Sequence, residues 1–327
     1  MIKVAIIGAS GYTGAELLRL LVRHPEVQLE CAYSRTNSGR MVSAVHPDLL
    51  GQTDLVFSEQ LPNGADLWFL CLPHGESADF LGKHRSKIGH ARIIDLSNSF
   101  RHMNSSSHDG RNFVFGLPEL NAAAIKKAEN IANPGCFATA ITLALAPLYH
   151  GGHVGESSEV HVNATTGSTG AGTALSPTSH FSYRVNNLSW YKPFVHQHLA
   201  EIAEQLTGKP NAQPKLYFLP QRGAFTRGIF ATAYTHFNGT LAEAQALYAN
   251  FYKDAVFTHL SPDPLQLKSV VGTNNCQIHL HQHEDMLLLT AVIDNLIKGA
   301  SGQAVENMNL MFGFEQSTAL QLKANLY

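Results

Sequence analysis

Short apolar runs alternate with helical patterns along the first third of the chain. Four such runs follow one another, at residues 3–8, 27–33, 66–73 and 91–97. They are rich in β-branched and other large apolar residues, as is typical of strands buried on both faces. A helical pattern of leucines follows the first run and stops before Pro25. Strands alternating with helices predict a parallel sheet wrapped by helices. The polar, turn-rich stretch 101–112 is expected to be a surface loop.

The pattern changes after residue 136. An Ala- and Leu-rich helix is expected to begin at Cys136, with Pro147 near its end. Strand-like segments then dominate, at 158–166, 215–220, 228–237, 276–283 and 285–293. Helical patterns interrupt them at 199–208 and 241–256, and a last helix is expected at 302–314. Several strands with few intervening helices predict an antiparallel or mixed sheet, and therefore an α+β second domain.

Composition narrows the classes of protein that fit. A chain of 327 residues with 44% apolar residues is expected to form two domains with real cores. The net charge is −2 and no long run of Lys or Arg occurs, which argues against nucleic acid or an anionic membrane as the main partner. No apolar stretch approaches the roughly 20 residues that span a bilayer. Four scattered cysteines without a CxxC pair suit reduced thiols, so we expect a cytoplasmic protein.

A glycine-rich turn, GASGYTG, joins the first expected strand to the first expected helix. In this position glycines allow a tight turn and close approach of the backbone to a pyrophosphate, which the helix N-terminus then favours. The residues expected to contact a dinucleotide here are Gly8, Ser10, Gly11, Tyr12, Thr13 and Gly14. The alternative is that these glycines only form the turn.

The end of the second expected strand bears on the choice of cofactor. An NAD site usually carries Asp or Glu about 20 residues after the glycines. Here the sequence reads YSRTNSG, with Ser34, Arg35 and Ser38 and no acid. Arginine and hydroxyl groups bind a 2′-phosphate that a carboxylate would repel, so we expect NADP. The alternative is an arginine that is merely solvated.

Cys136 lies in NPGCFATA, directly after a Pro-Gly turn and at the expected start of a helix. The positive potential of a helix N-terminus favours thiolate over thiol. Cys136 is therefore the candidate nucleophile, with a buried cysteine at a helix start as the alternative. Cys31 and Cys71 lie inside apolar strands and are expected to be core residues.

A thiolate nucleophile needs a partner for proton transfer. The segment VHQHLAEI stands out among the histidines because His196, His198 and Glu201 precede a helix. Metal binding by the H-x-H pair needs more ligands than are evident. A row of alternating histidines at 279, 281 and 283 also invites a metal interpretation, but a solvated or interface face is the more usual arrangement. We expect no metal.

Two further segments carry groups suited to anions. TTGSTGAG is a glycine and hydroxyl loop after a strand, and its backbone is expected to form a nest for a substrate phosphate at Gly167, Ser168 and Gly170. A flexible turn is the alternative. QRGAFTRGI places Arg222 and Arg227 before a strand, where either binds a carboxylate or is solvated.

The chain closely resembles the N-acetyl-γ-glutamyl-phosphate reductase family, the NADPH-dependent enzymes of arginine biosynthesis. The segments that carry the resemblance occur in family order: GASGYTGAEL, LPHGES, IIDLSNSFR, NPGCFATA, GSTGAG, HQHLAEI, FTRGI and DNLIKGASGQAVENMNLMFG. The resemblance implies an α/β protein with a Rossmann-type NADP-binding domain at 1–135, completed by a C-terminal helix within 301–327. It also implies an α+β catalytic domain at 136–300 and a homo-oligomer, either dimer or tetramer.

The resemblance also assigns residues. Cys136 matches the family's nucleophile, His196 its acid/base histidine, and Glu201 a nearby acidic residue. By the same resemblance we expect Asn133 and Arg227 at the substrate and Asn295 at the cofactor. The chain departs from the usual pattern at four places, listed with the common residue in brackets: Phe137-Ala138 (Tyr-Pro), Gln197 (Arg), Ala200 (Pro) and Gln221 (His).

The expected reaction reduces an acyl phosphate through a thioester on Cys136, with His196 as imidazolium protonating the developing oxyanion. One alternative is a reductase for another phosphorylated acid, such as aspartyl or aminoadipyl phosphate. Another is a Rossmann-type redox sensor that binds NADP without turnover.

Overall fold

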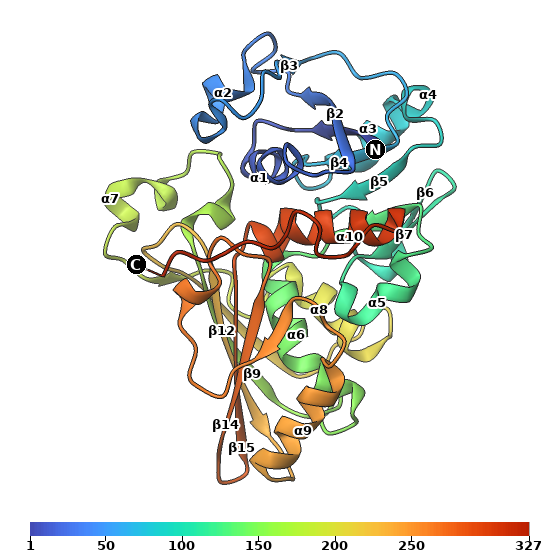
Figure 1. Ribbon diagram of the computed structural model, residues 1–327. Helices are drawn as coiled ribbons and strands as arrows, with labels where there is room; N and C mark the ends of the chain where they lie inside the picture. Colours follow the sequence, from blue (N-terminus) through green and yellow to red (C-terminus); the bar gives the residue numbers. More distant parts are fainter. Residues whose placement is uncertain (327) are drawn as a thin grey trace. The chain divides into compact units, whose positions relative to one another are not determined.

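The computed structural model describes residues 1–326, which divide into two compact units (Figure 1). The first unit comprises Met1–Pro134 and Ala300–Gln321. The second comprises Gly135–Gly299 and, as far as the chain is described, the residues from Leu322 onward. No helix within residues 1–326 is both long enough and apolar enough to cross a bilayer.

An eight-stranded sheet forms the centre of the first unit, in the order β3-β2-β1-β4-β5-β8-β7-β6. Its strands are β1 (Ile2–Ile7), β2 (Val27–Tyr33), β3 (Phe57–Ser58), β4 (Leu67–Leu70), β5 (Arg92–Asp95), β6 (Ser107–His108), β7 (Arg111–Phe115) and β8 (Asn130–Ala132). Every neighbouring pair is parallel except β6 and β7. The parallel sheet expected from the apolar runs is confirmed.

Helices accompany this sheet in the Rossmann manner. They are α1 (Tyr12–Leu21), α2 (Val42–Val45), α3 (Glu76–Lys83), α4 (Arg85–Ile88), α5 (Pro118–Ile125) and α10 (Gly302–Phe312). The last helix, α10, contacts α1 and α5, although 177 or more residues of sequence separate it from both. Its side chains are buried over almost its whole length, which explains why it carries apolar residues on more than one face.

The stretch 101–112, expected to be a surface loop, contains ordered structure. Strands β6 and β7 pair there as a short antiparallel hairpin, with Ser107 opposite Asn112. Asp109 and Gly110 form the turn with φ of 52° and 76°, the left-handed conformations that a tight hairpin turn needs. The expectation was wrong because polar residues at a solvated sheet edge have the same composition as a loop.

A mixed seven-stranded sheet forms the second unit, in the order β10-β11-β9-β12-β15-β14-β13. Its strands are β9 (Val160–Thr166), β10 (Ser189–Trp190), β11 (Leu216–Arg222), β12 (Ile229–His236), β13 (Thr258–Leu260), β14 (Cys276–His283) and β15 (Met286–Ile293). The pairs β11–β9 and β13–β14 are parallel and the others antiparallel. This confirms the mixed sheet and the α+β class.

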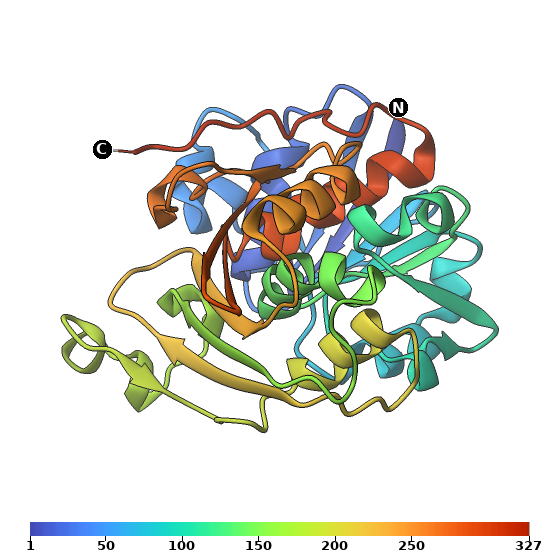
Figure 2. The same cartoon turned by 90° about the horizontal axis from the view of Figure 1, so that it is seen from below.

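Helices cover one face of that sheet. They are α6 (Cys136–His150), α8 (His198–Thr207) and α9 (Leu241–Phe251), while the short α7 (Phe181–Arg184) belongs to a long excursion between β9 and β10. Figures 1 and 2 show α6 in green and α8 in yellow on the same side of the sheet, in agreement with the contacts of α6 with α8, β12 and β15. Helix α6 is buried from Phe137 to Tyr149, so its first residue, the half-buried Cys136, is held at a fixed place.

Candidate active site

The glycine-rich turn leads from β1 directly into α1. Gly8 has a φ of 83°, and a Cβ added there would lie 2.3 Å from the carbonyl oxygen of Cys71. A Cβ on Gly14 would lie 2.6 Å from the Cα of Ala9. Both positions therefore require glycine. Gly11 caps α1 without a side-chain acceptor, so the cap leaves the first N–H groups of the helix available to an anion.

The end of β2 lies beside this turn. The hydroxyl oxygens of Ser10 and Ser34 are 3.0 Å apart, although 24 residues separate them in the sequence. Arg35 and Ser38 follow in an exposed loop, and Tyr12 is exposed at the start of α1. The carbonyl of Thr13 accepts a hydrogen bond from the Ser301 hydroxyl, which joins α10 to the turn. The structure thus brings the glycine turn and the second-strand loop together, as a dinucleotide site requires.

Cys136 is the first residue of α6, and Gly135 is its N-cap. The backbone N–H of Gly135 donates to Oε1 of Glu201 at 2.7 Å. Glu201 is 2% exposed, so this bond fixes the turn before Cys136 from within the core. The sulfur lies at the positive end of a fifteen-residue helix, where a thiolate is stabilised.

A π-helical turn, η6 (Ile297–Ser301), presses Gly299 against Cys136. A Cβ added to Gly299 would lie 2.8 Å from the Cβ of Cys136 and 3.2 Å from its Cα. Isolated π-turns are uncommon and occur frequently at functional sites. Here the turn places Gly299 so close to Cys136 that a side chain at position 299 would displace the cysteine or the turn.

His196 is buried beside Cys136's helix. Its ring lies edge-on to that of Phe137, with centroids 5.6 Å apart. Burial, together with the positive charges of Lys192 and Arg222, lowers the pKa of His196 to about 4. This lowered pKa contradicts the imidazolium expected from the sequence, because it favours the neutral ring near pH 7. Its Nδ1 accepts the N–H of His198 at 3.2 Å, so the proton of the neutral ring is on Nε2.

Tyr191 belongs to the same cluster and was not anticipated from the sequence. Its ring packs edge-on against that of His196 at 5.6 Å, and the guanidinium of Arg222 lies 4.8 Å from its centroid. Burial raises the pKa of Tyr191 to about 12, and the negative charge of Cys136 adds to the rise. No periodic pattern marks this tyrosine, because it lies in an irregular segment after β10.

The loop at 167–172 does not form the open backbone nest expected for a phosphate. The N–H groups of Gly167, Ser168 and Thr169 donate to carbonyl oxygens of residues 225–228. A Cβ on Gly167 would lie 2.4 Å from the carbonyl oxygen of Thr226, so the glycine serves this close strand-to-loop contact. Gly170 is exposed at the far side of the loop.

Three other expected site residues make structural bonds. The amide of Asn295 accepts the N–H of Gly228 at 2.7 Å and donates to the Thr169 hydroxyl at 3.0 Å, which braces the 167–172 loop. Arg227 forms a two-point ion pair with the fully buried Asp294, at 3.0 and 3.2 Å.

The third residue, Asn133, lies in the first unit. Its amide donates to the Ala300 carbonyl at 3.0 Å and accepts from Asn307 of α10 at 3.0 Å. Asn133 is 1% exposed and therefore holds the C-terminal helix to the end of β8.

The remaining cysteines and histidines differ from the cluster around Cys136. Burial raises the pKa of Cys31 to about 11 and that of Cys71 to about 12, which disfavours their thiolates. On β14, His279 donates its Nδ1–H to the Ser261 carbonyl at 3.0 Å, while His281 is exposed. Within residues 1–326, no three His, Cys, Asp or Glu side chains are grouped to hold a metal ion.

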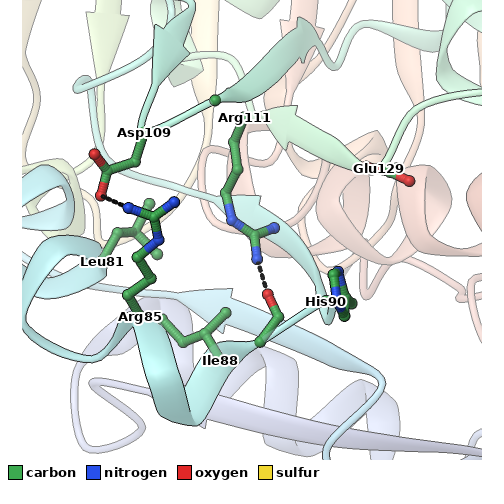
Figure 3. A pocket seen from close by; sticks show the side chains of 9 residues that line it. Leu81, Arg85, Ile88, His90, Asp109, Arg111 and Glu129 are labelled. Carbon is green, nitrogen blue, oxygen red and sulfur yellow. Dashed lines mark hydrogen bonds and ion pairs between the residues drawn. The ribbon is translucent and has the colours of Figure 1, made fainter.

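A cavity of about 390 Å³ lies elsewhere in the first unit, beside the amino ends of β5 and β7 (Figure 3). Arg111 donates there to the Gly89 carbonyl at 2.5 Å and to Asn130 Oδ1 at 2.9 Å, so it braces the cavity wall. Arg85 and Asp109 face each other across it at 4.0 Å. Because the strands are parallel, this cavity is at the opposite sheet edge from the glycine turn and is not part of the cofactor site.

Comparison with known proteins defines the class. A family model described as the NAD binding domain of semialdehyde dehydrogenase matches residues 3–128, and one described as its dimerisation domain matches residues 136–295. The fold is also that of aspartate semialdehyde dehydrogenase II from Vibrio cholerae, with a TM-score of 0.72 at 17% identity over 96% of this chain and 98% of that one. The aspartate semialdehyde dehydrogenase from Candida albicans, solved with NADP, gives a TM-score of 0.66 at 15% identity over 95% and 98%. The chain is thus a semialdehyde dehydrogenase by fold.

Two full-length relatives narrow the class. The N-acetyl-gamma-glutamyl-phosphate reductase of Christiangramia forsetii is 50% identical over 100% of both chains. That of Flavobacterium johnsoniae is 51% identical over 99% of both. The chain belongs to the N-acetyl-gamma-glutamyl-phosphate reductase family, and its first unit binds a nicotinamide cofactor.

Proposed function

We propose that the protein reduces N-acetyl-L-glutamyl 5-phosphate with NADPH to N-acetyl-L-glutamate 5-semialdehyde and phosphate, in arginine biosynthesis. The observation that carries this proposal is Cys136 at the start of α6, in one cluster with His196 and Tyr191. The full-length relatives at 50% and 51% identity support the substrate. The cytoplasm, where thiols stay reduced, suits the four free cysteines of the chain.

The cofactor is proposed to be NADP. Gly8 and Gly14 allow the tight turn, Gly11 places no side chain at the start of α1 where the pyrophosphate would bind, and the Ser10–Ser34 pair borders the ribose side. Arg35 and Ser38, with no acid beside them, favour a 2′-phosphate over a free hydroxyl. The reduced nicotinamide supplies the hydride of the reaction. Asn295 is also proposed to lie near the bound cofactor. Its amide oxygen accepts the N–H of Gly228, which fixes the orientation of the side chain.

The first chemical step is assigned to Cys136. Its thiolate attacks the acyl carbon, the new C–S bond replaces the C–O bond to phosphate, and the departing phosphate takes the one proton that the reaction consumes. The product is a thioester on Cys136. Hydride addition to the thioester carbon then gives a thiohemiacetal oxyanion, which collapses to the aldehyde and restores the thiolate.

His196 acts on the oxygen of these intermediates. In its neutral form the ring carries its proton on Nε2, which donates a hydrogen bond to the oxyanion as negative charge develops. A positioned group of this kind contributes roughly 10²–10⁴-fold to the rate. Glu201 accepts the Gly135 N–H and so supports the turn before Cys136. Asn133 and Arg227 are proposed to shape the substrate site, each held in place by a bond of its own: Asn133 donates to the Ala300 carbonyl, and Arg227 pairs with Asp294.

The direct test runs the reaction backwards. The protein is mixed with N-acetylglutamate semialdehyde, inorganic phosphate and NADP⁺, and NADPH formation is followed by absorbance. Phosphate-dependent turnover is expected with this substrate and not with aspartate semialdehyde or aminoadipate semialdehyde. Turnover with one of those aldehydes alone would move the enzyme to another substrate. Cofactor binding without any turnover would instead indicate a redox sensor.

Matched cysteine variants test the nucleophile. Cys136→Ser is expected to abolish turnover, because an alcohol at this position is a much poorer nucleophile near neutral pH. Cys71→Ser, in the first unit, is expected to keep turnover within a few-fold of the parent. Substantial activity in Cys136→Ser would refute the thioester step.

The face of the seven-stranded sheet opposite α6, α8 and α9 is proposed to pack against a second copy of the chain. Along this face His161 stacks between Tyr217 and Tyr234, with centroids 5.0 and 5.1 Å away. A hollow of about 490 Å³ lies on the same unit, with Phe225 and Phe230 among its apolar lining. The match to a dimerisation domain supports this surface. Light scattering measures the molar mass of the parent and of Tyr217→Asp. A smaller mass for the variant is expected if the dimer or tetramer forms through this face, and an unchanged mass would place the interface on another surface.

A further inference from the structure

Two buried polar groups remain without a hydrogen-bond partner where β9 and β11 end. They are the Nε–H of Arg222 and the hydroxyl of Thr166, judged over residues 1–326. The two residues are register partners in the parallel β9–β11 pair, so their side chains leave the sheet on the same face. Thr166 is 1% exposed. Leaving a buried polar group unpaired costs roughly 1–3 kcal/mol, so a hydrogen-bond acceptor that reaches both groups would be stabilised at this place.

This face of the sheet is the one that carries the reactive cluster. Phe218, four residues before Arg222 on β11, points to the same side and contacts the rings of Phe137 and His196 at 5.2 and 5.5 Å. Arg222 itself lies 4.8 Å from the ring of Tyr191, which touches His196 edge-on. The two unpaired groups therefore lie beside the cysteine and histidine and not at a remote surface.

Two positive charges act on this cluster. Lys192 and Arg222 both act electrostatically on His196. The carboxylate of Glu201 accepts the Gly135 N–H at the far side of the cysteine turn. Arg227, in contrast, has Asp294 as its counter-ion. A guanidinium with a buried N–H, next to a buried hydroxyl, is suited to an oxyanion.

We propose that Arg222 and Thr166 form a subsite that binds an oxyanion group of the substrate. Arg222 donates its Nε–H and Thr166 its hydroxyl proton, while Tyr191 holds the guanidinium plane by stacking. The chemistry fits either oxyanion of the substrate, its carboxylate or its phosphoryl group. The identity of the substrate rests on the proposed function, whereas the subsite rests on the geometry of these three residues. Arg222, and not the ion-paired Arg227, is therefore the arginine that selects for an anionic substrate.

The reverse reaction separates the two oxyanions, because phosphate and the semialdehyde are then different molecules. Their KM values are measured for the parent, Arg222→Met, Thr166→Val and the control Lys215→Met, which lies exposed just before the same strand. Arg222→Met is expected to raise the KM of one oxyanion substrate about 10–100-fold and Thr166→Val less. The KM of NADP⁺ is expected to stay unchanged. A rise for the semialdehyde assigns the subsite to the carboxylate, and a rise for phosphate assigns it to the phosphoryl group.

A second readout does not depend on turnover. Iodoacetamide labelling of Cys136 is quantified by peptide mass spectrometry, with and without inorganic phosphate or N-acetylglutamate. At least one of these anions is expected to slow labelling in the parent and in Lys215→Met but not in Arg222→Met. Unchanged protection together with unchanged KM values would overturn the subsite. Protection of the parent but not of Arg222→Met, in a protein without turnover, would retain the subsite and reject the proposed function.

Discussion

Glu201 accepts the backbone N–H of Gly135 at 2.7 Å, one residue before the candidate nucleophile and 66 residues away in the sequence. The carboxylate is 2% exposed, so it acts on the turn and not on solvent. This bond fixes the direction in which α6 leaves the turn, and with it the place of the Cys136 sulfur. We therefore propose that Glu201 is a positioning residue for the cysteine.

Substitution of Glu201 tests that role. Glu201→Ala leaves the Gly135 N–H buried and unpaired, which is expected to lower the free energy of unfolding by about 1–3 kcal/mol. It is also expected to lower kcat about 10-fold or more, because the cysteine turn loses its support. Glu201→Gln retains an oxygen acceptor and is expected to recover most of both. Urea unfolding and steady-state kinetics measure the two effects. If Gln behaves as Ala does, the carboxylate has a chemical role in addition to positioning.

The buried, neutral His196 makes stability depend on pH. Its pKa is lowered to about 4 in the folded chain, while an unfolded chain has the ordinary value near 6.5. Between these values the unfolded state binds the additional proton. The stability contribution is therefore complete above about pH 6.5 and is lost as pH falls through about 4. The loss amounts to about 3 kcal/mol over that range.

Urea unfolding at several pH values measures this contribution. The parent is expected to lose more stability than His196→Asn between pH 6.5 and 4, because the variant lacks the titrating ring. Parallel curves for the two proteins would show that His196 has an ordinary pKa in the folded chain, so that its ring is protonated below about pH 6.5. In that case the hydrogen-bond donor proposed for the oxyanion would be an imidazolium after all.

The regular elements were predictable because burial imposes a period on the sequence. Strand β2 was predicted with its observed bounds, Val27–Tyr33, and α6 with its observed start at Cys136. Strands β3 and β8 were not predicted, since two or three residues are too few to show a period. The hairpin β6–β7 was missed because its polar residues match a loop in composition.

The candidate site was only partly predictable. The glycine turn, Cys136 and His196 have local signatures, and in the structure Cys136 begins α6 while His196 is buried beside that helix. The contacts around them join distant segments, and nothing in a single sequence marks Tyr191 as a neighbour of His196. The neutral state of His196 could not be predicted either, because it depends on burial and on charges from other segments.

The proposed NADP preference depends on Arg35 in the loop after β2. Arg35→Ala is expected to raise the KM of NADPH about 10-fold or more and to leave that of NADH nearly unchanged, since only NADPH carries a 2′-phosphate. Arg40→Ala is the matched control, because Arg40 is exposed in the same loop and bonds to Asn37 and Ala44. Kinetics with both cofactors measure the ratio. Equal effects on NADPH and NADH would remove Arg35 from the 2′-phosphate site.

Gly299 tests whether the π-turn positions the nucleophile. In Gly299→Ala the new methyl group would lie 2.8 Å from the Cβ of Cys136, so the cysteine or the turn must move. Displacement of a reacting group by a fraction of an ångström to 1 Å is expected to lower kcat about 10–100-fold. Cofactor binding is expected to be unchanged, because the glycine-rich turn belongs to the first unit.

The control for Gly299→Ala is Gly155→Ala, also in the second unit, where an added Cβ meets nothing within 4 Å. That variant is expected to keep kcat and the rate of iodoacetamide labelling at Cys136. In Gly299→Ala both quantities are expected to change together, because the same sulfur serves both reactions. A lower kcat with normal labelling would place the effect of Gly299 on the substrate and not on the cysteine. Normal values of both would show that the π-turn absorbs the methyl group without moving Cys136.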